Sequence, residues 1–320
     1  MVMGAVLALG SVNADFVVRT ESSPAGPGSL AAHSLLRTSG GKAGNRAVLA
    51  ARLGAPARLL AGVGDDDLAA QALRGPENAG VNLRAVRRRP GPTGYASIVV
   101  PTDGAKTILR VPNANDAWGE DETKVALEVD AAPDGSVVTV DCEIPVALVR
   151  AALEGARERG FVTVLDPAPP SRVSDELLAL TDHLTPDHSE AAELTGVKIS
   201  GSADAARAAE ALRERGAGVV HVKLADGGCV TASADGVTLI EAPAVEVVDA
   251  TGAGDAFAGA LAVALLGGRS TLDAAAYAVA ASTCAVTAYG SQESYPDPAA
   301  LAPVLAAVLD RVRPLPVKKG

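Results

Sequence analysis

Apolar runs with strand character alternate with helical patterns along most of this 320-residue chain, and this alternation limits the folds that it can adopt. The strand-like runs occupy residues 5–9, 137–140, 162–165 and 219–222. Helical patterns lie between and after them, at residues 43–53, 145–159, 189–194, 203–215 and 254–266. Strands that alternate with helices form βαβ units. The sequence therefore predicts one α/β domain over residues 1–320, with three layers in which helices flank both faces of a mainly parallel sheet.

Two segments, residues 15–38 and 93–111, break this alternation. They contain short alternating patterns, such as Tyr95, Ser97 and Val99, separated by Gly and Pro, and these predict antiparallel strands inserted into the α/β body. Such strands could be ordinary surface hairpins, or they could form a small β-sheet that acts as a lid over a substrate cleft. In folds of this class, ligands bind at the carboxyl ends of the parallel strands.

Composition excludes several classes of function. A net charge of −10 and an aromatic content of 2% argue against a nucleic-acid partner, which needs a basic face or stacking rings. Arg87, Arg88 and Arg89 form a basic run that we expect to face solvent at a strand edge. The three cysteines and four histidines show no zinc-ligand spacing, and we expect a reducing cytoplasm. The apolar start of the chain is too short to cross a bilayer, so no membrane association is predicted.

The most informative segment is residues 247–259, VVDATGAGDAFAG, where a β-rich run leads through small residues into a helix. Gly252, Ala253 and Gly254 leave their backbone amides open to close approach by an anion, and a helix N-terminus adds donors and a favourable dipole. Asp255 stands beside them and could accept a proton from an attacking hydroxyl. The alternative is an ordinary helix start with an acidic first turn.

This segment resembles the D-x-x-G-A-G-D signature of the ribokinase-type (PfkB) carbohydrate kinases. A second block, GGKAGN at residues 40–45, resembles the sugar-binding signature G-G-K-G-A-N of the same family, with Ala43 and Gly44 exchanged. Further similarity is found at residues 10–15, 62–66, 92–94, 166–169 and 185–190, where Asp166 and Asp187 replace the Asn of the family motifs. The resemblance covers residues 4–310 and implies a ribokinase-like fold with a β-sheet lid.

The resemblance also implies roles for individual residues. Asp255 would be the catalytic base, with the amides of Gly252, Ala253 and Gly254 as the anion hole. The sugar would contact Asn13, Asp15, Gly41, Lys42, Asn45, Glu143 and Asp255. ATP would contact Asp187, Lys223, Asp226, Gly228 and Gly254. Mg²⁺ would bind near Glu190, for which acidic helix capping is the alternative interpretation. A monovalent cation, K⁺, would lie among Asp249, Thr251, Ala285, Ala288, Gly290 and Ser294.

The predicted reaction is ATP-dependent phosphorylation of a sugar, with D-ribose at its 5-hydroxyl as the favoured substrate. Fructose, 2-keto-3-deoxygluconate, adenosine and pseudouridine remain alternatives because one fold hosts many substrates. A sugar sensor without catalysis is a second class of function, although such a protein would have no use for Asp255. The chain has neither the G-x-G-x-x-G of dinucleotide enzymes after its first strand nor a P-loop. We also expect a homodimer formed through the lid, since an exposed small sheet leaves free edges.

Overall fold

A ten-stranded sheet forms the centre of the protein, in a computed structural model that describes residues 4–24, 26, 28–102, 107–119 and 121–316. Parts of the two segments expected to form a lid, residues 25, 27 and 103–106, lie outside the described residues. The strands of this sheet, in spatial order, are β14 (Val312–Pro314), β13 (Gly236–Ile240), β12 (Cys229–Ser233), β11 (Val219–Lys223), β10 (His183–Leu184), β9 (Val162–Asp166), β8 (Val137–Asp141), β1 (Val6–Leu9), β4 (Ala57–Val63) and β5 (Val86–Arg88). Neighbours from β11 through β5 pair in parallel, and β11 through β14 pair antiparallel.

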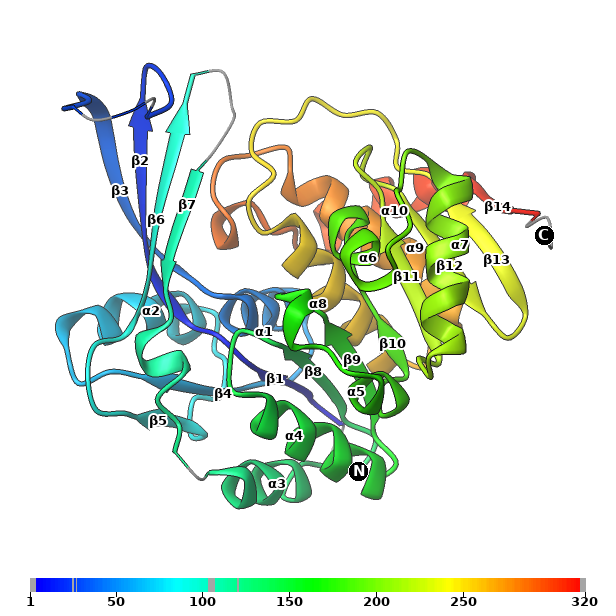
Figure 1. Ribbon diagram of the computed structural model, residues 1–320, viewed down its shortest axis with the longest axis horizontal. Helices are drawn as coiled ribbons and strands as arrows, with labels where there is room; N and C mark the ends of the chain where they lie inside the picture. The colour runs from blue at the N-terminus through cyan, green and yellow to red at the C-terminus, as the bar shows by residue number, and fades with distance from the viewer. Residues whose placement is uncertain (1–3, 25, 27, 103–106, 120, 317–320) are drawn as a thin grey trace.

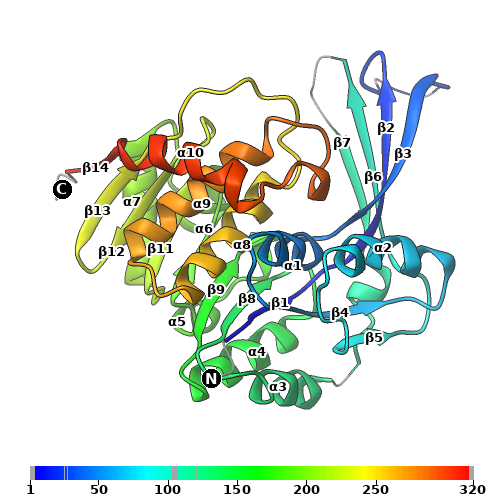
Figure 2. The same ribbon diagram turned by 180° about the vertical axis from the view of Figure 1, so that it is seen from behind.

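Helices cover both faces of this sheet, as the two opposite views in Figures 1 and 2 show. Alternate residues of β1 point to opposite faces, with Val6 and Ala8 in one apolar core and Leu7 and Leu9 in the other. The first core contains α1 (Lys42–Arg52), α2 (Asp67–Asn78), α8 (Ala253–Leu266), α9 (Thr271–Ala285) and α10 (Pro298–Leu309). The second contains α3 (Glu122–Asp130), α4 (Val146–Glu158), α5 (Asp175–Ala179), α6 (His188–Thr195) and α7 (Ser202–Glu214). The predicted three-layer α/β fold is confirmed.

Alanine and branched aliphatic residues fill both cores, as the low aromatic content requires. Short 3₁₀ turns complete the connections, namely η1 (Asn113–Asn115), η2 (Pro170–Arg172) and η3 (Gln292–Ser294). Among the described residues, none of the helices combines the length and the hydropathy that crossing a bilayer requires.

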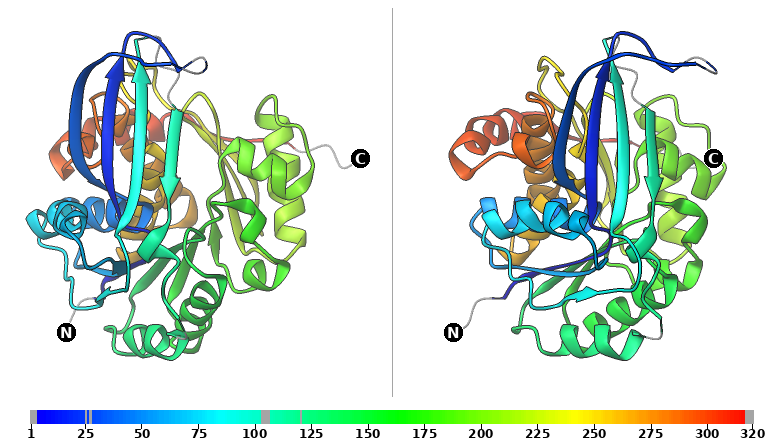
Figure 3. Two further views of the ribbon diagram at one scale, coloured as in Figure 1. Left: turned by 60° about the vertical axis from the view of Figure 1, so that its left-hand side comes forward. Right: turned by 90° about the vertical axis from the view of Figure 1, so that its left-hand side faces the viewer.

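A separate four-stranded sheet projects from the body beside the carboxyl ends of the central strands (Figure 3). Its order is β3 (Ala32–Gly40), β2 (Asn13–Thr20), β6 (Gly94–Pro101) and β7 (Thr107–Val111). The prediction of antiparallel strands was wrong for one pair, because β2 and β6 run parallel while the other pairs are antiparallel. The whole of α1, β4, α2 and β5 lies between β3 and β6 in the chain, and this long crossover permits the parallel pairing.

The basic run at residues 87–89 covers the end of the edge strand β5 and the residue after it, and the side chains of Arg87 and Arg89 differ in environment. Arg87 forms an ion pair with Glu128 at 2.6 Å and is partly exposed. Arg89, expected to face solvent, is instead 11% exposed, pairs with Asp121 and lies over the Trp118 ring at 4.7 Å. The indole face and the carboxylate together stabilise the guanidinium away from water.

Two buried histidines face each other across neighbouring strands in the second half of the large sheet. His183 Nδ1 lies 3.0 Å from His221 Nε2, and His221 Nδ1 lies 2.9 Å from Thr231 Oγ1. Burial lowers the pKa of His183 to about 4 and lowers the pKa of His221 well below its ordinary value. Both rings are therefore neutral in the folded protein near neutral pH.

We predict that the free energy of unfolding falls as the pH is lowered from about 6.5 toward about 4, because the unfolded chain binds protons that folded His183 and His221 do not. His183→Asn should reduce the slope by up to about 1.4 kcal/mol per pH unit in this window. Urea unfolding of the wild type and of His183→Asn, at intervals from pH 7.5 to pH 4.5, measures this slope. Equal slopes in the two proteins would contradict the assignment of the pH dependence to His183.

Candidate active site

Charged side chains gather at the carboxyl ends of β1, β8 and β9, against the first turns of α1. Lys42 Nζ donates to Asp166 Oδ2 at 3.0 Å, and Arg46 Nη2 donates to Asp141 Oδ2 at 2.6 Å. Arg46 Nη1 also lies 3.7 Å from Asp166 Oδ2. The side chains of Arg46, Asp141 and Asp166 have no exposed surface. We call Lys42, Arg46, Asp141 and Asp166 the buried charge cluster.

The surroundings of the cluster shift its pKa values in different directions. Burial raises the pKa of Asp141 to about 6, although the Arg46 charge opposes that shift. Burial also acts to raise the pKa of Asp166, but the charges of Lys42, Lys223 and Arg46 together outweigh it and hold the pKa below its usual range. For Lys42, burial acts to lower the pKa, and the carboxylates of Asp166 and Asp255 raise it above its ordinary value. Lys42 is therefore a permanent positive charge in this site.

The cluster organises the loop that follows β1. Asp141 Oδ1 accepts hydrogen bonds from Ser11 N at 3.3 Å and from Glu143 N at 3.0 Å. Ser11 Oγ donates to Glu143 Oε2 at 2.7 Å and accepts from Lys42 N at 3.0 Å. Glu143 also forms an ion pair with Arg110 of the small sheet. One of the predicted sugar contacts, Glu143, is thus held by both the body and the small sheet.

Asp255 lies in the first turn of α8 and is 8% exposed. Its Oδ2 accepts a hydrogen bond from Asn45 Nδ2 at 2.7 Å, and Gln292 Nε2 in turn donates to Asn45 Oδ1 at 2.9 Å. The other oxygen, Oδ1, is buried, accepts no hydrogen bond within the described part of the chain, and lies 3.8 Å from Lys42 Nζ. A buried acceptor without a donor is unfavourable, so Oδ1 is suited to a ligand hydroxyl.

The turn before α8 depends on a glycine. Gly252 has a φ of 77°, and a Cβ at this position would lie 2.6 Å from Ser291 Cβ. The left-handed conformation and the close approach both require glycine here. Ala253 N makes a long hydrogen bond of 3.4 Å to Ala250 O, and the space beside Gly254 is bordered by Lys223 Nζ. The predicted anion hole therefore has a positive charge at its side.

Two cavities meet the site. The first, of about 440 Å³, is lined by Lys42, Lys223, Glu190 and residues 250–255. The second, of about 230 Å³, is lined by Asn13, Asn115, Glu143 and Arg110. Strand β7 contributes to both, with Ile108 in the first and Arg110 in the second. The small sheet therefore borders both cavities, and Asp255 belongs to the lining of the first.

The remaining predicted sugar contacts lie around the base of the small sheet. Asn13 Oδ1 accepts a hydrogen bond from Asn115 Nδ2 at 2.8 Å. Gly41 precedes α1 and lies against the backbone of residues 11–13, where a Cβ would be 2.5 Å from Val12 Cα. Burial, and then the charges of Asp255 and Glu293, raise the pKa of Asp15 to about 7. Asp15 can therefore act as a donor or an acceptor near neutral pH.

The residues predicted to bind nucleotide fall into two neighbouring cavities. Asp187 and Lys223 line the 440 Å³ cavity, while Asp226 and Gly228 line an adjacent cavity of about 450 Å³. The two cavities share three lining residues, which are His188, Leu224 and Ala225. The arrangement offers one space for charged phosphates and another for the rest of a nucleotide.

Asp187 and Glu190 form a capping box at the start of α6, which was the alternative interpretation of these acids. Glu190 Oε2 accepts from Asp187 N at 2.7 Å, and Asp187 Oδ1 accepts from Glu190 N at 2.8 Å. Burial and the Asp166 charge raise the pKa of Glu190. In the described ranges, no group of three or more His, Cys, Asp or Glu side chains is arranged to hold a metal ion. A Mg²⁺ ion here would need phosphate oxygens and water as its other ligands, which suits its preferences.

The predicted monovalent-cation residues come from two segments that the structure brings together. Asp249 Oδ1 accepts from Thr251 Oγ1 at 2.6 Å, and Asp249 Oδ2 accepts from Gly290 N at 3.1 Å. Val248 N and Asp249 N both donate to Val286 O. Ala285, Ala288 and Ser294 belong to the second of these segments, which ends α9 and leads into η3. Backbone carbonyls and a carboxylate are a donor set suited to a hard cation.

Sequence reasoning did not identify Arg46, Asp141, Asn115 or Gln292. Arg46 lies one helical turn after Lys42, and Asp141 directly follows an apolar strand, so both positions carried a detectable signal. Asn115 and Gln292 lie in 3₁₀ turns far from their partners in sequence. No local pattern marks these two residues.

The chain is similar to proteins of one known family. The family described as "pfkB family carbohydrate kinase" matches residues 3–298. The ribokinase of Haemophilus influenzae is 31% identical over 293 residues, which cover 90% of this chain and 94% of that protein. A bifunctional ribokinase/ribose-5-phosphate isomerase A of Fructilactobacillus sanfranciscensis is 35% identical over 298 residues. The match covers 92% of this chain, and the chain spans only 55% of that relative.

The fold is similar to that of solved ribokinases. The structure of Arabidopsis thaliana ribokinase complexed with ribose and ATP superposes with a TM-score of 0.80 at 27% identity. The superposition covers 95% of this chain and 99% of that one. Both the sequence match over nearly the whole length and this structural likeness agree with the motifs at residues 40–45 and 249–255. The chain belongs to the PfkB family of carbohydrate kinases.

Proposed function

We propose that this protein is an ATP-dependent ribose kinase, which transfers the γ-phosphate of Mg-ATP to the 5-hydroxyl of D-ribose. The observation that carries the proposal is the buried Oδ1 of Asp255, which has no hydrogen-bond donor within the described residues and belongs to a residue that lines the 440 Å³ cavity together with Lys42 and the start of α8. Relatives named ribokinase match this chain over most of their length, and this supports ribose as the sugar.

In this proposal Asp255 acts as the general base. The sugar would occupy the 230 Å³ cavity, where Asn13 and Glu143 offer acceptors and donors to its hydroxyl groups. Asp15, Gly41, Lys42 and Asn45, which lie outside the lining of that cavity, would extend the sugar contacts toward Asp255. The reacting hydroxyl gives its proton to Asp255 Oδ1, while Asn45 holds Oδ2. The hydroxyl oxygen bonds to the γ-phosphorus, the bond to the bridging oxygen breaks, and ADP leaves.

The N-terminus of α8 receives the charge that develops on the transferred group. The amides that follow Gly252 and the Lys223 ammonium face the 440 Å³ cavity, and fixed donors of this kind stabilise a transition state. Asp187, Lys223, Asp226, Gly228 and Gly254 would contact ATP. Glu190 would hold Mg²⁺ through its carboxylate or through water, and Mg²⁺ would supply charge neutralisation of the phosphates. K⁺ bound at residues 249–251 and 285–294 would support the turn that precedes α8.

Other substrates remain alternatives within the same mechanism. Fructose, 2-keto-3-deoxygluconate, adenosine and pseudouridine would change only the contacts in the 230 Å³ cavity. A sensor that binds sugar without turnover is the alternative of another class. The position of Asp255 in the cavity that Lys223 and residues 252–254 also line favours catalysis over this alternative.

We predict that Asp255→Asn lowers kcat by roughly 10²–10⁴, because an amide cannot accept the proton, while the affinity for ATP stays nearly constant. Initial rates of ADP formation with ribose and Mg-ATP measure the effect. Asp235→Asn, at an exposed carboxylate in the turn between β12 and β13, is the matched control and should retain normal kcat. A near-normal kcat for Asp255→Asn in a folded protein would remove Asp255 from the mechanism.

The substrate assignment predicts that ribose gives the highest kcat/KM in a panel that also contains 2-deoxyribose, fructose, 2-keto-3-deoxygluconate, adenosine and pseudouridine. We expect turnover to require Mg²⁺ and to rise when K⁺ replaces a bulky organic cation. A different best substrate would change the pocket assignment and keep the mechanism. Binding of sugar without any ADP formation would instead favour the sensor.

We also propose that the small sheet closes over the cavities as a lid, that the protein acts in the cytoplasm, and that two copies pair through the small sheet. This sheet carries Leu35 and Leu109 on one face and Leu36 and Ile108 on the other, each more than 40% exposed. Exposed apolar clusters of this kind favour association.

The pairing predicts a dimer in sedimentation velocity at micromolar concentration. Leu35→Lys should shift the protein to monomer, because it places a charge in the apolar contact. Leu127→Lys, at an exposed leucine on α3, is the control and should remain dimeric. A wild-type protein that sediments as a monomer would contradict the pairing.

A further inference from the structure

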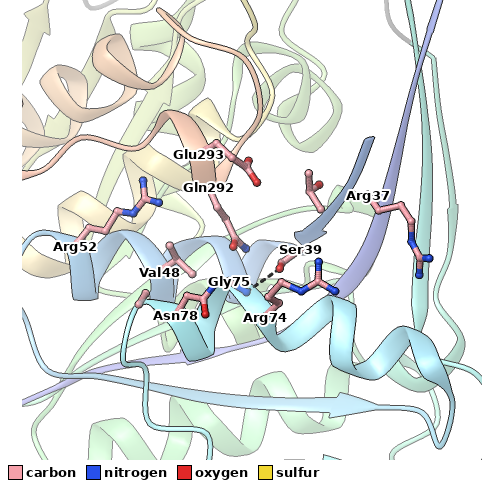
Figure 4. A pocket seen from close by; sticks show the side chains of 11 residues that line it. Arg37, Ser39, Val48, Arg52, Arg74, Gly75, Asn78, Gln292 and Glu293 are labelled. Atoms are coloured by element: carbon pink, nitrogen blue, oxygen red, sulfur yellow. Dashed lines mark hydrogen bonds between the residues drawn. The ribbon is translucent and has the colours of Figure 1, made fainter. Parts of the chain in front are cut away.

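A third large cavity, of about 430 Å³, lies outside the proposed sugar and nucleotide cavities (Figure 4). It is enclosed by α1, α2, the end of β3 and η3. Figure 4 shows Gln292 and Glu293 on one side and Arg74 and Asn78 on the other. Its size is within the range of small-molecule sites in proteins.

Three arginines line this cavity, and they differ in what they already bind. Arg37 Nε donates to Gln71 Oε1 at 2.7 Å, and its guanidinium lies 5.1 Å from the centre of the Phe16 ring. Arg52 Nη1 donates to Tyr295 O at 3.1 Å. Arg74 makes no hydrogen bond or ion pair with the residues that the structure describes. Guanidinium groups with free donors match the oxygens of a phosphate group.

The rest of the lining mixes polar side chains with Val48 and Ala79, and it includes one acid. Asn78, Ser39 and Gln292 can pair with hydroxyl groups, and Glu293 can accept from them but repels an anion. A ligand that spans the cavity would carry a phosphate at Arg74 and hydroxyls at Glu293, which lie on opposite sides of it. We infer that this cavity is a second binding site, specific for a phosphorylated polyhydroxyl compound such as a sugar phosphate.

The cavity is connected to the base of the small sheet through Ser39 of β3, whose hydroxyl takes part in the hydrogen bonding of α2. Gly75 N donates to Ser39 Oγ at 2.8 Å (Figure 4). Ser39 Oγ in turn donates to Gln71 O at 3.0 Å. The Ser39 hydroxyl thus bridges the Gly75 amide and the Gln71 carbonyl, which would pair directly in an uninterrupted helix. The next residue, Pro76, already removes one backbone donor from this turn. A ligand at Arg74 and Ser39 would contact the turn of α2 that lacks these regular backbone hydrogen bonds.

A second connection leads to the catalytic base. Gln292 Oε1 lies against Gly75, where a Cβ would be 1.8 Å away, so only glycine admits the side chain. Gln292 Nε2 donates to Asn45, which donates to Asp255. A ligand that shifts Gln292 would therefore change the orientation of Asn45 and the position of Asp255. This effect on turnover rests on the proposed function, whereas binding in the cavity does not.

Calorimetric titration with ribose 5-phosphate tests the site in three proteins: wild type, Arg74→Ala, and Arg84→Ala as a control at another exposed arginine. We expect wild type and Arg84→Ala to share a binding step that Arg74→Ala weakens by about tenfold or more, since hydrogen bonds between charged groups are lost. Inorganic phosphate should bind at this site more weakly than ribose 5-phosphate does. Equal titrations for all three proteins, or no binding to wild type, would overturn the site. Equal affinity for inorganic phosphate would overturn the polyhydroxyl specificity.

A rate measurement tests the connection to Asp255. With saturating ribose and Mg-ATP, added ribose 5-phosphate should change kcat in wild type and in Arg84→Ala but not in Arg74→Ala. An unchanged kcat in all three, despite the binding step, would overturn the connection. If ribose is not the substrate, the titrations still decide whether the site exists.

Discussion

The pairing of Arg46 with Asp141 and Asp166 is the interaction on which the site depends. None of the three side chains reaches solvent, and breaking a buried ion pair costs about 3–5 kcal/mol because it leaves a charge without a partner. The carboxylates come from the ends of β8 and β9, and the guanidinium comes from α1 and also donates to Leu9 O at the end of β1. The charges can be satisfied only when these three strands and α1 are in their final positions. Correct assembly of the sheet edge and correct assembly of the site are therefore the same event.

Lys42 extends this network toward the base. Its ammonium lies 3.0 Å from Asp166 and 3.8 Å from Asp255, so Asp166 holds the closer contact. A tighter pair with Asp255 would occupy the carboxylate oxygen that the proposed reaction uses. Asp166 thus keeps a positive charge beside Asp255 while Oδ1 remains accessible to a ligand. Asn45, one turn along the same helix, fixes the other oxygen.

The sequence predicted the central fold well because buried parallel strands are continuous apolar runs that do not depend on distant partners. The motif at residues 249–255 was equally local, since its glycines and acids share one turn. Pairing between β2 and β6 was predicted wrongly, because alternation within a strand does not reveal the direction of its neighbour. Gln292 and Asn115 could not be predicted, since each acts on a residue about a hundred or more positions away. Arg46 could have been predicted as part of the site, because a charged residue on the side of a helix that faces the protein core needs a buried partner.

The position of β2 joins the small sheet to the proposed sugar site by covalent structure alone. The strand begins at Asn13, four residues after the end of β1, and carries Asp15 two residues later. Gln71 Nε2 donates to both Asp15 O and Thr38 O at 3.0 Å, and so fixes the base of β2 and β3 to α2. Any rotation of the small sheet must turn about this point. Because Arg110 and Ile108 lie on the same sheet, such a rotation would change the walls of both cavities.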